Sequence, residues 1–464
     1  MRASSRPALL IALALAAGMV ATAGLVDAAH WRAPVAPIAA PAPPSLAAPT
    51  SAAVLPPSTS TSTSTTAVPD PAARNLSARL DAVLANTNSC LVVHDARGLV
   101  YRHGSAPLTP ASTQKLLVGA AALDVLGPSF RFATSVVAAR PPVGGVADEL
   151  WLVGGGDPVL ASPGYIDHLE SQPLTAGVIP TTQLIALAAQ LDAAGVRRVA
   201  GAVHGDDSRY ERLRALPGWK QIYFDEADIA PLSALEVDDG LEGWTPERVA
   251  SDPAFHAADV FARLVGGRKI AAVPGPDGVA PPGGVVLASI QSPPLADLVS
   301  AMIRSSNNLT AELLLRELDR ARGGSGTSAG GATVVAAEAA KLGLPVDGLR
   351  MVDGSGLSPA DRATCDLLLA VLALGDRPAF APISAGLSVA GHNGTLVNRF
   401  LGTPAAGHLV AKTGSIAGVT GLVGVLDEHQ PLRFALLANG DFGYLAGAGL
   451  EDRVIAALGT YPES

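Results

Sequence analysis

Three short groups of polar residues in this chain have the types and spacing that nucleophilic catalysis requires. The first is Ser112 and Lys115, the only Ser-x-x-Lys pattern in the sequence. Three positions are about one helical turn, so both side chains would project from the same face. A serine hydroxyl becomes nucleophilic when a neighbour takes its proton, and a lysine can do so only if burial or another cation lowers its pKa. The apolar residues that follow Lys115 favour burial over a solvated helix face.

The second group is Ser306 and Asn308, in the break between two apolar segments. An overlapping pair, Ser305 and Asn307, has the same spacing. Taken alone, either pair is more typical of a helix N-cap than of an active site, because Ser and Asn side chains accept hydrogen bonds from the first free amides of a helix.

The third group is Lys412, Thr413 and Gly414, inside an apolar run typical of a strand. A lysine at such a position is costly unless it faces a cleft. Gly414 would allow another part of the molecule to approach the strand backbone. Only five lysines occur among the 32 basic residues of the chain, and two of them lie in these groups.

Alternating helix and strand patterns surround the three groups and predict a mixed α and β fold. Apolar spacing of the helical kind predicts helices, and runs rich in Val, Leu and Ala between Gly turns predict strands. The expected helices are 73–86, 112–127, 181–195, 295–304, 311–322, 332–343, 363–375 and 452–459, and the main strand regions are 90–105, 131–139, 149–155, 283–290 and 408–440.

Length and charge exclude several classes of protein. The 464 residues are enough for two or three domains. The net charge is −9 and no cluster of Lys and Arg occurs, which argues against a nucleic-acid partner. Only residues 7–26 form a continuous apolar run of membrane-spanning length without a charge, so the chain is not a polytopic membrane protein.

The N-terminal region predicts export. Arg2 and Arg6 precede the apolar run, as in a secretory signal, so residues 1–29 are expected to be a cleaved signal peptide or an uncleaved membrane anchor. Residues 30–72 are dominated by Ala, Pro, Ser and Thr and are expected to be a disordered linker. The expected location is extracytoplasmic, in the cell envelope or secreted, with the membrane involved only through the possible anchor.

Taken together and in this order, the three groups resemble the motifs of penicillin-binding proteins and serine β-lactamases. Their flanks, PLTPASTQKLLVGAAALDVLGPSFRF, SSNNLTAELLL, DGSGLSPADRAT and AKTGSIAGVTGLVG, resemble the D-alanyl-D-alanine carboxypeptidase/endopeptidase family, the class C low-molecular-mass penicillin-binding proteins. The long interval between Ser112 and Ser306 agrees with the large insertion of that family. The resemblance implies an α/β (α+β) fold, with a transpeptidase/β-lactamase-like catalytic domain built from residues 73–135 and 292–464, and a mainly β insert at 136–291.

The resemblance also implies a role for each motif residue in a serine-type peptidase that trims peptidoglycan stem peptides ending in D-Ala-D-Ala. Ser112 would be the nucleophile and Lys115 its general base. The family register selects Ser306 as proton relay and Asn308 as a substrate-amide contact, over the overlapping pair. The substrate's terminal carboxylate would meet the charge of Lys412 and the side chains of Thr413 and Ser415, beside Gly414, and the backbone amides of Ser112 and Ser415 would form the oxyanion hole.

One departure from the family concerns the side chain of the third stem residue. Relatives that prefer diaminopimelate place an arginine directly after the Ser-Gly-Leu-Ser segment, whereas this chain has Pro359 there, and its nearest cation is Arg362. Arg362 could reach the substrate pocket or only flank a helix start. The insert offers acids for the matching amine: Asp225, Glu226 and Asp228.

No cofactor and no metal is expected, because the His and Cys residues lack metal-ligand spacing. Cys90 and Cys365 could form a disulfide or remain buried thiols. β-Lactam antibiotics are expected to act as covalent inhibitors. The alternatives are a β-lactamase or esterase on the same fold, or a non-catalytic cell-wall-binding protein.

Overall fold

The structure is a computed structural model that describes residues 71–172 and 179–462. The expected signal or anchor at 1–29 lies outside the described residues, as does the expected linker at 30–72 except for its last two positions. Those two positions begin helix α1 (Pro71–Leu84).

A six-stranded sheet joins the two ends of the described chain. Its strand order is β13-β14-β15-β16-β1-β2, and every neighbouring pair is antiparallel. The strands are β1 (Asn88–Asp95), β2 (Gly98–His103), β13 (Ser388–Val389), β14 (Leu409–Ile416), β15 (Val419–Leu426) and β16 (Leu432–Asn439). Because β1 pairs with β16, the segment that carries Ser112 starts from the same sheet that carries Lys412.

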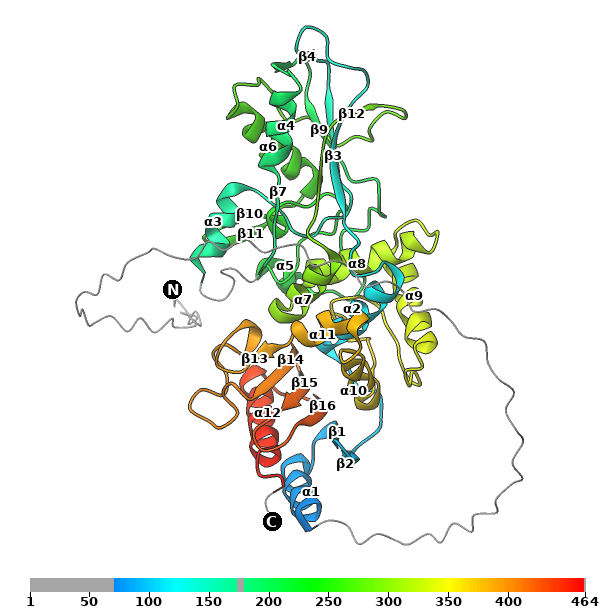
Figure 1. Cartoon of the computed structure of the whole chain (residues 1–464), viewed down its shortest axis with the longest axis vertical. Coiled ribbons are helices and arrows are strands. Elements are labelled where there is room, and N and C mark those ends of the chain that lie inside the picture. The colour runs from blue at the N-terminus through cyan, green and yellow to red at the C-terminus, as the bar shows by residue number, and fades with distance from the viewer. Residues whose placement is uncertain (1–70, 173–178, 463–464) are drawn as a thin grey trace, which may run out of the picture. The chain divides into compact units, whose positions relative to one another are not determined.

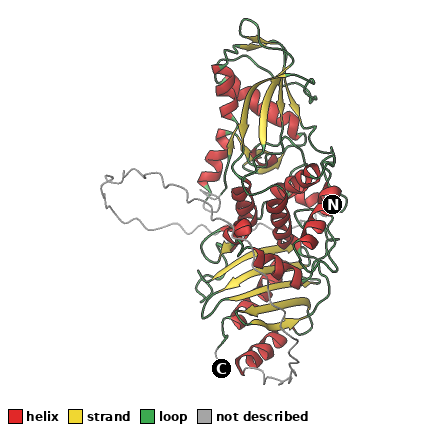
Figure 2. Cartoon of the chain, turned by 45° about the vertical axis from the view of Figure 1, so that its right-hand side comes forward, coloured by secondary structure: helices red, strands yellow, loops and turns green. Residues whose placement is uncertain are grey.

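Helices cover both faces of this sheet, as Figures 1 and 2 show. Successive residues of β1 alternate between the two cores: Cys90 and Val92 face one, Leu91 and Val93 the other. One core is closed by α1 and α12 (Tyr444–Leu458). The other is closed by α2 (Lys115–Val125), α7 (Leu295–Ser305), α8 (Asn308–Ala321), α9 (Ser328–Lys341), α10 (Cys365–Leu374) and α11 (Ala381–Ala385). The predicted mixed α and β fold is confirmed.

The segment between the first two motifs folds around a second sheet, of order β12-β3-β5-β9. Its strands are β3 (Ala133–Ala138), β5 (Leu150–Val153), β9 (Val203–Asp206) and β12 (Val285–Gln291). Shorter strands are β4 (Val146–Ala147), β6 (Leu160–Ala161), β7 (Thr182–Gln183), β8 (Arg198–Val199), β10 (Leu241–Trp244) and β11 (Glu247–Val249). The boundary expected after residue 135 falls within β3, and the domain limits stay a prediction.

The segment expected to be mainly β also contains helices α3 (Pro163–Ser171), α4 (Ile185–Ala193), α5 (Gln221–Asp225) and α6 (Pro253–Gly266). A start signal for α6 is present in the sequence: Asp252 caps it by accepting a hydrogen bond from the Phe255 amide, and a proline follows at the first helical position. The Gly- and Pro-rich surroundings hid this signal.

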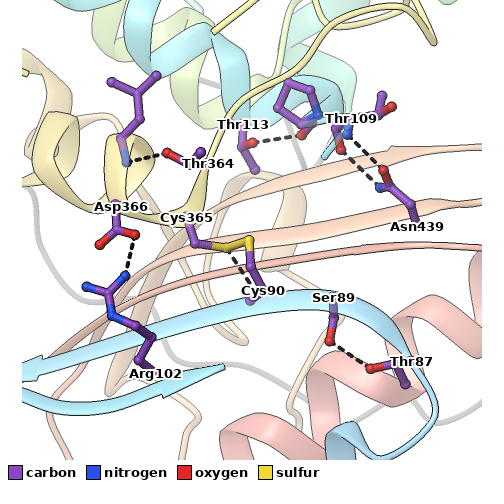
Figure 3. The surroundings of a disulfide bond; sticks show 12 residues. Thr87, Ser89, Cys90, Arg102, Thr109, Thr113, Thr364, Cys365, Asp366 and Asn439 are labelled. Atoms are coloured by element: carbon purple, nitrogen blue, oxygen red, sulfur yellow. Dashed lines mark hydrogen bonds and ion pairs between the residues drawn. A yellow bond between two sulfur atoms is a disulfide. The ribbon is translucent and has the colours of Figure 1, made fainter. Parts of the chain in front are cut away.

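Cys90 and Cys365 form a disulfide, which resolves the two alternatives left by the sequence (Figure 3). The bond ties β1 to the first residue of α10, within the core that also holds α2. Its Cα atoms are 6.0 Å apart, and the Cys365 Sγ also lies 3.0 Å from the Cys90 carbonyl oxygen.

Within residues 71–172 and 179–462, no single helix is long and apolar enough to cross a membrane. The bent pair Cys365–Leu374 and Pro378–Ala385 meets the length and composition requirement only when its two helices are taken together.

Candidate active site

Ser112 lies in a single 3-10 turn, Ala111–Gln114, that leads directly into α2. The helix expected to begin at Ser112 therefore begins in regular α form at Lys115. Before the turn, the backbone amide of Thr109 donates to Asn439 Oδ1 (2.8 Å), and Asn439 Nδ2 donates back to the Thr109 carbonyl (3.1 Å; Figure 3). This reciprocal pair fixes the approach to Ser112 against the end of β16.

Lys115 is completely buried, and its amine meets three oxygen atoms. Its Nζ lies 2.6 Å from Asn308 Oδ1, 2.6 Å from the carbonyl oxygen of Ser355 and 2.9 Å from Ser112 Oγ. A neutral amine has two N–H groups and one lone pair. The amide and carbonyl oxygens can only accept, so the lone pair is left to take the proton of the Ser112 hydroxyl.

The second and third motifs meet at a break between helices. Ser306 follows α7 in a left-handed conformation (φ 61°), and its Oγ lies 2.8 Å from the Lys412 Nζ. Lys412 also donates to the Thr413 carbonyl (2.7 Å). Asn308 begins α8 and donates from Nδ2 to the carbonyl of Asp228 in the insert (2.8 Å).

The overlapping pair faces elsewhere. Asn307 caps α8 by accepting from the Thr310 amide, and its Nδ2 donates to the carboxylate of Asp239. Ser305 donates to the carbonyl of Ala301 in its own helix. The N-cap chemistry visible in the sequence therefore belongs to Asn307, whereas Ser306 and Asn308 face the two lysines.

Burial shifts the titration of both lysines in the same direction. Removal from water lowers the pKa of Lys115 to about 7, against the opposing attraction of Asp353, Glu312 and Asp228. Burial, and then the nearby charge of Lys115, lowers the pKa of Lys412 well below its usual range. Two mutually repelling buried amines favour a state in which one of them is neutral near neutral pH.

Carboxylates that the sequence reasoning missed hold the segment beside Lys115. Glu312 Oε1 accepts from the amides of Gly354 (2.9 Å) and Ser355 (2.7 Å). Asp353 accepts from the amides of Gly356 (2.7 Å) and Ser358 (2.7 Å). These bonds aim the Ser355 carbonyl at the Lys115 amine. Glu312 follows Asn308 by four residues in α8, about one helical turn, and this spacing was the available signal.

The acidic cluster is buried and shares protons. Burial, and then the charge of Asp353, raises the pKa of Asp361 to about 9, so this carboxyl is protonated at neutral pH. The same two causes raise the pKa of Glu312 to about 7. Asp353 also accepts a hydrogen bond from the Trp219 indole (2.9 Å), which ties the insert to this cluster.

Two glycines permit the close packing around Ser112. A Cβ on Gly356, which has φ +82°, would lie 2.0 Å from the Ala111 carbonyl oxygen. A Cβ on Gly414 would lie 2.8 Å from the Pro110 carbonyl oxygen and 3.0 Å from the Thr113 amide. The close approach expected at Gly414 is therefore made by the turn that carries Ser112.

A cavity of about 780 Å³ opens over Ser112. Ser306, Asn308, Thr413 and Ser415 line one part of it, and the insert contributes Lys220, Tyr223, Glu226 and Asp228. Arg362 is not among the lining residues. Its guanidinium donates to Thr109 Oγ1 and to the Pro359 and Asp361 carbonyls, so it braces the segment before Ser112. Among the described residues that line the cavity, the positively charged side chain is Lys220, which the sequence analysis did not select.

Cofactor and metal ligands are a separate matter. Among residues 71–172 and 179–462, no three His, Cys, Asp or Glu side chains are arranged to hold a metal ion.

The sheet between helices, with a serine, two buried lysines and an Asn around one cavity, defines the chain as an active-site-serine enzyme of the penicillin-binding-protein fold. Residues 73–253 and 248–458 match the model of the D-Ala-D-Ala carboxypeptidase 3 (S13) family. The chain therefore belongs to this family and is a serine-type D-Ala-D-Ala carboxypeptidase.

Individual relatives agree. Carboxypeptidase DacB of Mycolicibacterium smegmatis is 33% identical over 92% of this chain and 91% of its own length. A D-alanyl-D-alanine carboxypeptidase of Actinomadura sp. strain R39 is 29% identical over 82% of this chain and 84% of its own length. The crystal structure of penicillin-binding protein 4 (dacB) from Haemophilus influenzae has a TM-score of 0.69 at 20% identity, over 83% of this chain and 99% of that one. This last likeness concerns the fold.

Proposed function

We propose that Ser112 is the nucleophile and Lys115 the general base of the carboxypeptidase reaction, acting on peptidoglycan stem peptides. The observation that carries the proposal is the environment of the Lys115 amine: two obligate acceptors take its N–H groups, and the Ser112 hydroxyl lies 2.9 Å from the remaining position. The lowered pKa of about 7 leaves a substantial neutral fraction of this amine at physiological pH.

The reaction then follows in two balanced steps. Ser112 Oγ attacks the carbonyl carbon between the two D-alanines while its proton moves to the Lys115 amine. The bond to the leaving nitrogen breaks as Ser306 gives that nitrogen its hydroxyl proton. The proton held by Lys115 replaces it through Lys412, whose Nζ lies 2.8 Å from Ser306 Oγ, so Lys115 is neutral again when free D-alanine departs. Water then attacks the Ser112 ester while Lys115 takes a proton from it; the ester bond breaks, Ser112 Oγ regains the proton from Lys115, and the shortened peptide leaves with a new carboxyl group. The backbone amides of Ser112 and Ser415 are the proposed oxyanion donors, a contribution commonly worth about 3–4 kcal/mol per donor.

The edge of β14 is the proposed seat of the substrate backbone. β13 pairs with β14 only at Val410 and Ala411, so within the described residues the stretch from Thr413 to Ser415 has no strand partner on that side. An extended peptide can complete this edge with main-chain hydrogen bonds. Thr413 and Ser415 would then bind the terminal carboxylate of the substrate. When that anion is bound, the protonated form of Lys412 is favoured.

Export is part of the proposal. A disulfide persists in oxidising compartments, so the Cys90–Cys365 bond supports an extracytoplasmic enzyme. The leader-like residues 1–29 support the same location. β-Lactams are the proposed covalent inhibitors, since their strained amide would acylate Ser112 in place of the peptide.

A fluorescent penicillin and a D-Ala-D-Ala pentapeptide test this proposal together. We expect the wild-type protein to be labelled and to release D-alanine, and Ser112→Ala to do neither, because the alanine has no nucleophile. Thermal unfolding of both proteins is the control for folding. Absence of label and of D-alanine release in the folded wild type would refute the proposal, and fast loss of label would indicate a β-lactamase.

A further prediction concerns the side chain of the third stem residue. The cavity wall carries Lys220 together with the acids Glu226 and Asp228, all from one insert segment, so a zwitterionic diaminopimelate end has partners of both signs. We expect kcat/KM for a peptide with that end to exceed the value for a neutral acetyl-lysine peptide by about ten- to a hundredfold.

The contribution of Arg362 is separable. Because its guanidinium is bound to Thr109 and backbone carbonyls, Arg362→Ala is expected to keep the preference, and Lys220→Ala to reduce it. Loss of the preference in Arg362→Ala alone would show that Arg362 reaches the substrate, and equal rates for both peptides in the wild type would show that the charged wall is not used.

A further inference from the structure

A second cavity, of about 600 Å³, lies beside the one over Ser112. Ser305 and Asn307 belong to the walls of both cavities. Because these two residues form the break that also carries Ser306, the second cavity adjoins the one proposed to hold the stem peptide.

Aromatic rings form one wall of this cavity. Tyr165 and His168 come from α3, and Trp244 ends β10. The His168 ring lies 5.6 Å from that of Trp244 with 26° between their planes, and 6.1 Å from that of Tyr165 with 29° between them. The three rings are stacked on one another along one side of the cavity, whereas a cage for a cation surrounds it from several sides. The outer ring of such a stack can pack against the C–H face of a sugar.

Carboxylates supply the polar groups of the cavity. Asp239 and Glu247 line it, and no Lys or Arg occurs among its described lining residues. A peptide carrying carboxylates would be repelled by such a wall. A neutral sugar would not be, and its hydroxyl groups can donate to both acids.

A pair of strained aspartates makes the cavity rigid and joins it to the active site. Asp238 and Asp239 both have positive φ, 59° and 56°. Asp238 accepts from the amide and hydroxyl of Ser162, which begins α3 with its aromatic side chains. Asp239 accepts both of its hydrogen bonds from Asn307 Nδ2. Strain of this kind persists where the surroundings over-determine it, typically at ligand sites.

We infer that this cavity, with Trp244 and His168 as the stacking wall and Asp239 and Glu247 as acceptors, binds an N-acetylated amino sugar of the glycan strand. The inference rests on the proposed function, because the stem peptide hangs from such a sugar. Four residues separate the sugar from the bond cut at Ser112, a span of about 13–14 Å when extended. The enzyme would thus recognise its substrate at both ends of the stem.

The test compares one pentapeptide in two forms: N-acetylated, and linked to the disaccharide N-acetylglucosaminyl-N-acetylmuramic acid. We expect the wild type to cleave the disaccharide form with a kcat/KM about tenfold higher, equivalent to about 1.4 kcal/mol. Trp244→Ala is expected to abolish this preference and to leave both the rate on the free peptide and penicillin acylation within about twofold. Trp151→Phe is the matched aromatic control outside this cavity, because Trp151 lies in β5 and stacks on His204, and it should keep the preference.

A binding measurement avoids dependence on turnover. Saturation-transfer NMR with chitotetraose should show contact with the wild type, and this signal should disappear in Trp244→Ala. Equal cleavage of the two wild-type substrates, or an equal loss on both in Trp244→Ala, would overturn the sugar site while leaving the peptidase intact. If the preference in kcat/KM instead followed a free amine on the peptide, the cavity would bind a cation and not a sugar, and the inference would be overturned. Failure to cleave either form would refute the proposed function itself.

Discussion

Replacing Lys115 by arginine is expected to lower the rate of acylation by at least about a thousandfold, within the range that a general base contributes. The reason is that a guanidinium stays protonated at any pH the protein survives, so the Ser112 proton has no acceptor. The buried amine of Lys115 has two N–H groups engaged by Asn308 and Ser355 and one position directed at Ser112. Arginine keeps the positive charge of the protonated lysine but has no lone pair that could accept the Ser112 proton.

Lys412→Arg is the informative comparison. The proposed role of Lys412 is to supply positive charge behind Ser306 and Thr413, and arginine keeps that charge. We expect it to retain a larger part of the wild-type rate. Lys341→Arg is the control at an exposed lysine, which pairs with Asp124 and Glu338 away from the cavity. Rates would be taken from the time course of fluorescent penicillin labelling. Equal rates for the Lys115 and Lys412 variants would reject the division of roles.

The three motifs were predictable from the sequence because each is short and its geometry is local. Ser112 and Lys115 are one turn apart on the chain, and the Ser306 and Asn308 pair is held by the start of one helix. Their meeting requires that the strand carrying Lys412 and the strand before Ser112 belong to one sheet. The apolar patterns predicted only a mixed α and β fold, and it was the family resemblance that implied a catalytic domain joining residues 73–135 to 292–464.

What the sequence did not reveal depends on contacts between distant segments. Glu312 has the helical spacing of an ordinary α8 residue, and only the fold brings it to the amides of Gly354 and Ser355. Likewise, the distance along the chain suggested Arg362 as the cation nearest the Ser-Gly-Leu-Ser segment, whereas the insert brings Lys220 to the cavity. Irregular segments have no periodicity, so their side chains cannot be placed by pattern alone.

Replacing Glu312 by glutamine is expected to move the pH dependence of acylation, and it tests whether Glu312 acts on Lys115 as a positioning residue through charge. Glutamine can still accept from the amides of Gly354 and Ser355, so the loop keeps its bonds. The carboxylate, however, raises the pKa of Lys115 against burial. Without it that pKa falls, and the acid limb of the acylation profile should shift to lower pH by at least about half a unit, or about 0.7 kcal/mol.

The shape of the limb should change as well. Lys115 and Glu312 both have a pKa of about 7, the first lowered and the second raised by burial. As pH rises, one loses its positive charge while the other gains a negative charge that opposes this loss, so the wild-type limb is spread over a broader range than a single titration. Glu312→Gln removes this contribution to the breadth, so the acid limb of its profile should be narrower than that of the wild type.

The control for this change is Glu338→Gln, at a buried glutamate whose partners, Arg322 and Lys341, lie outside the site. It removes the same charge and should leave the profile in place. If Glu312→Gln lowered the maximal acylation rate without moving the acid limb of the pH profile, Glu312 would only support the loop. A shift to higher pH would contradict the sign of its interaction with Lys115, since losing a nearby negative charge can only make a cation easier to deprotonate.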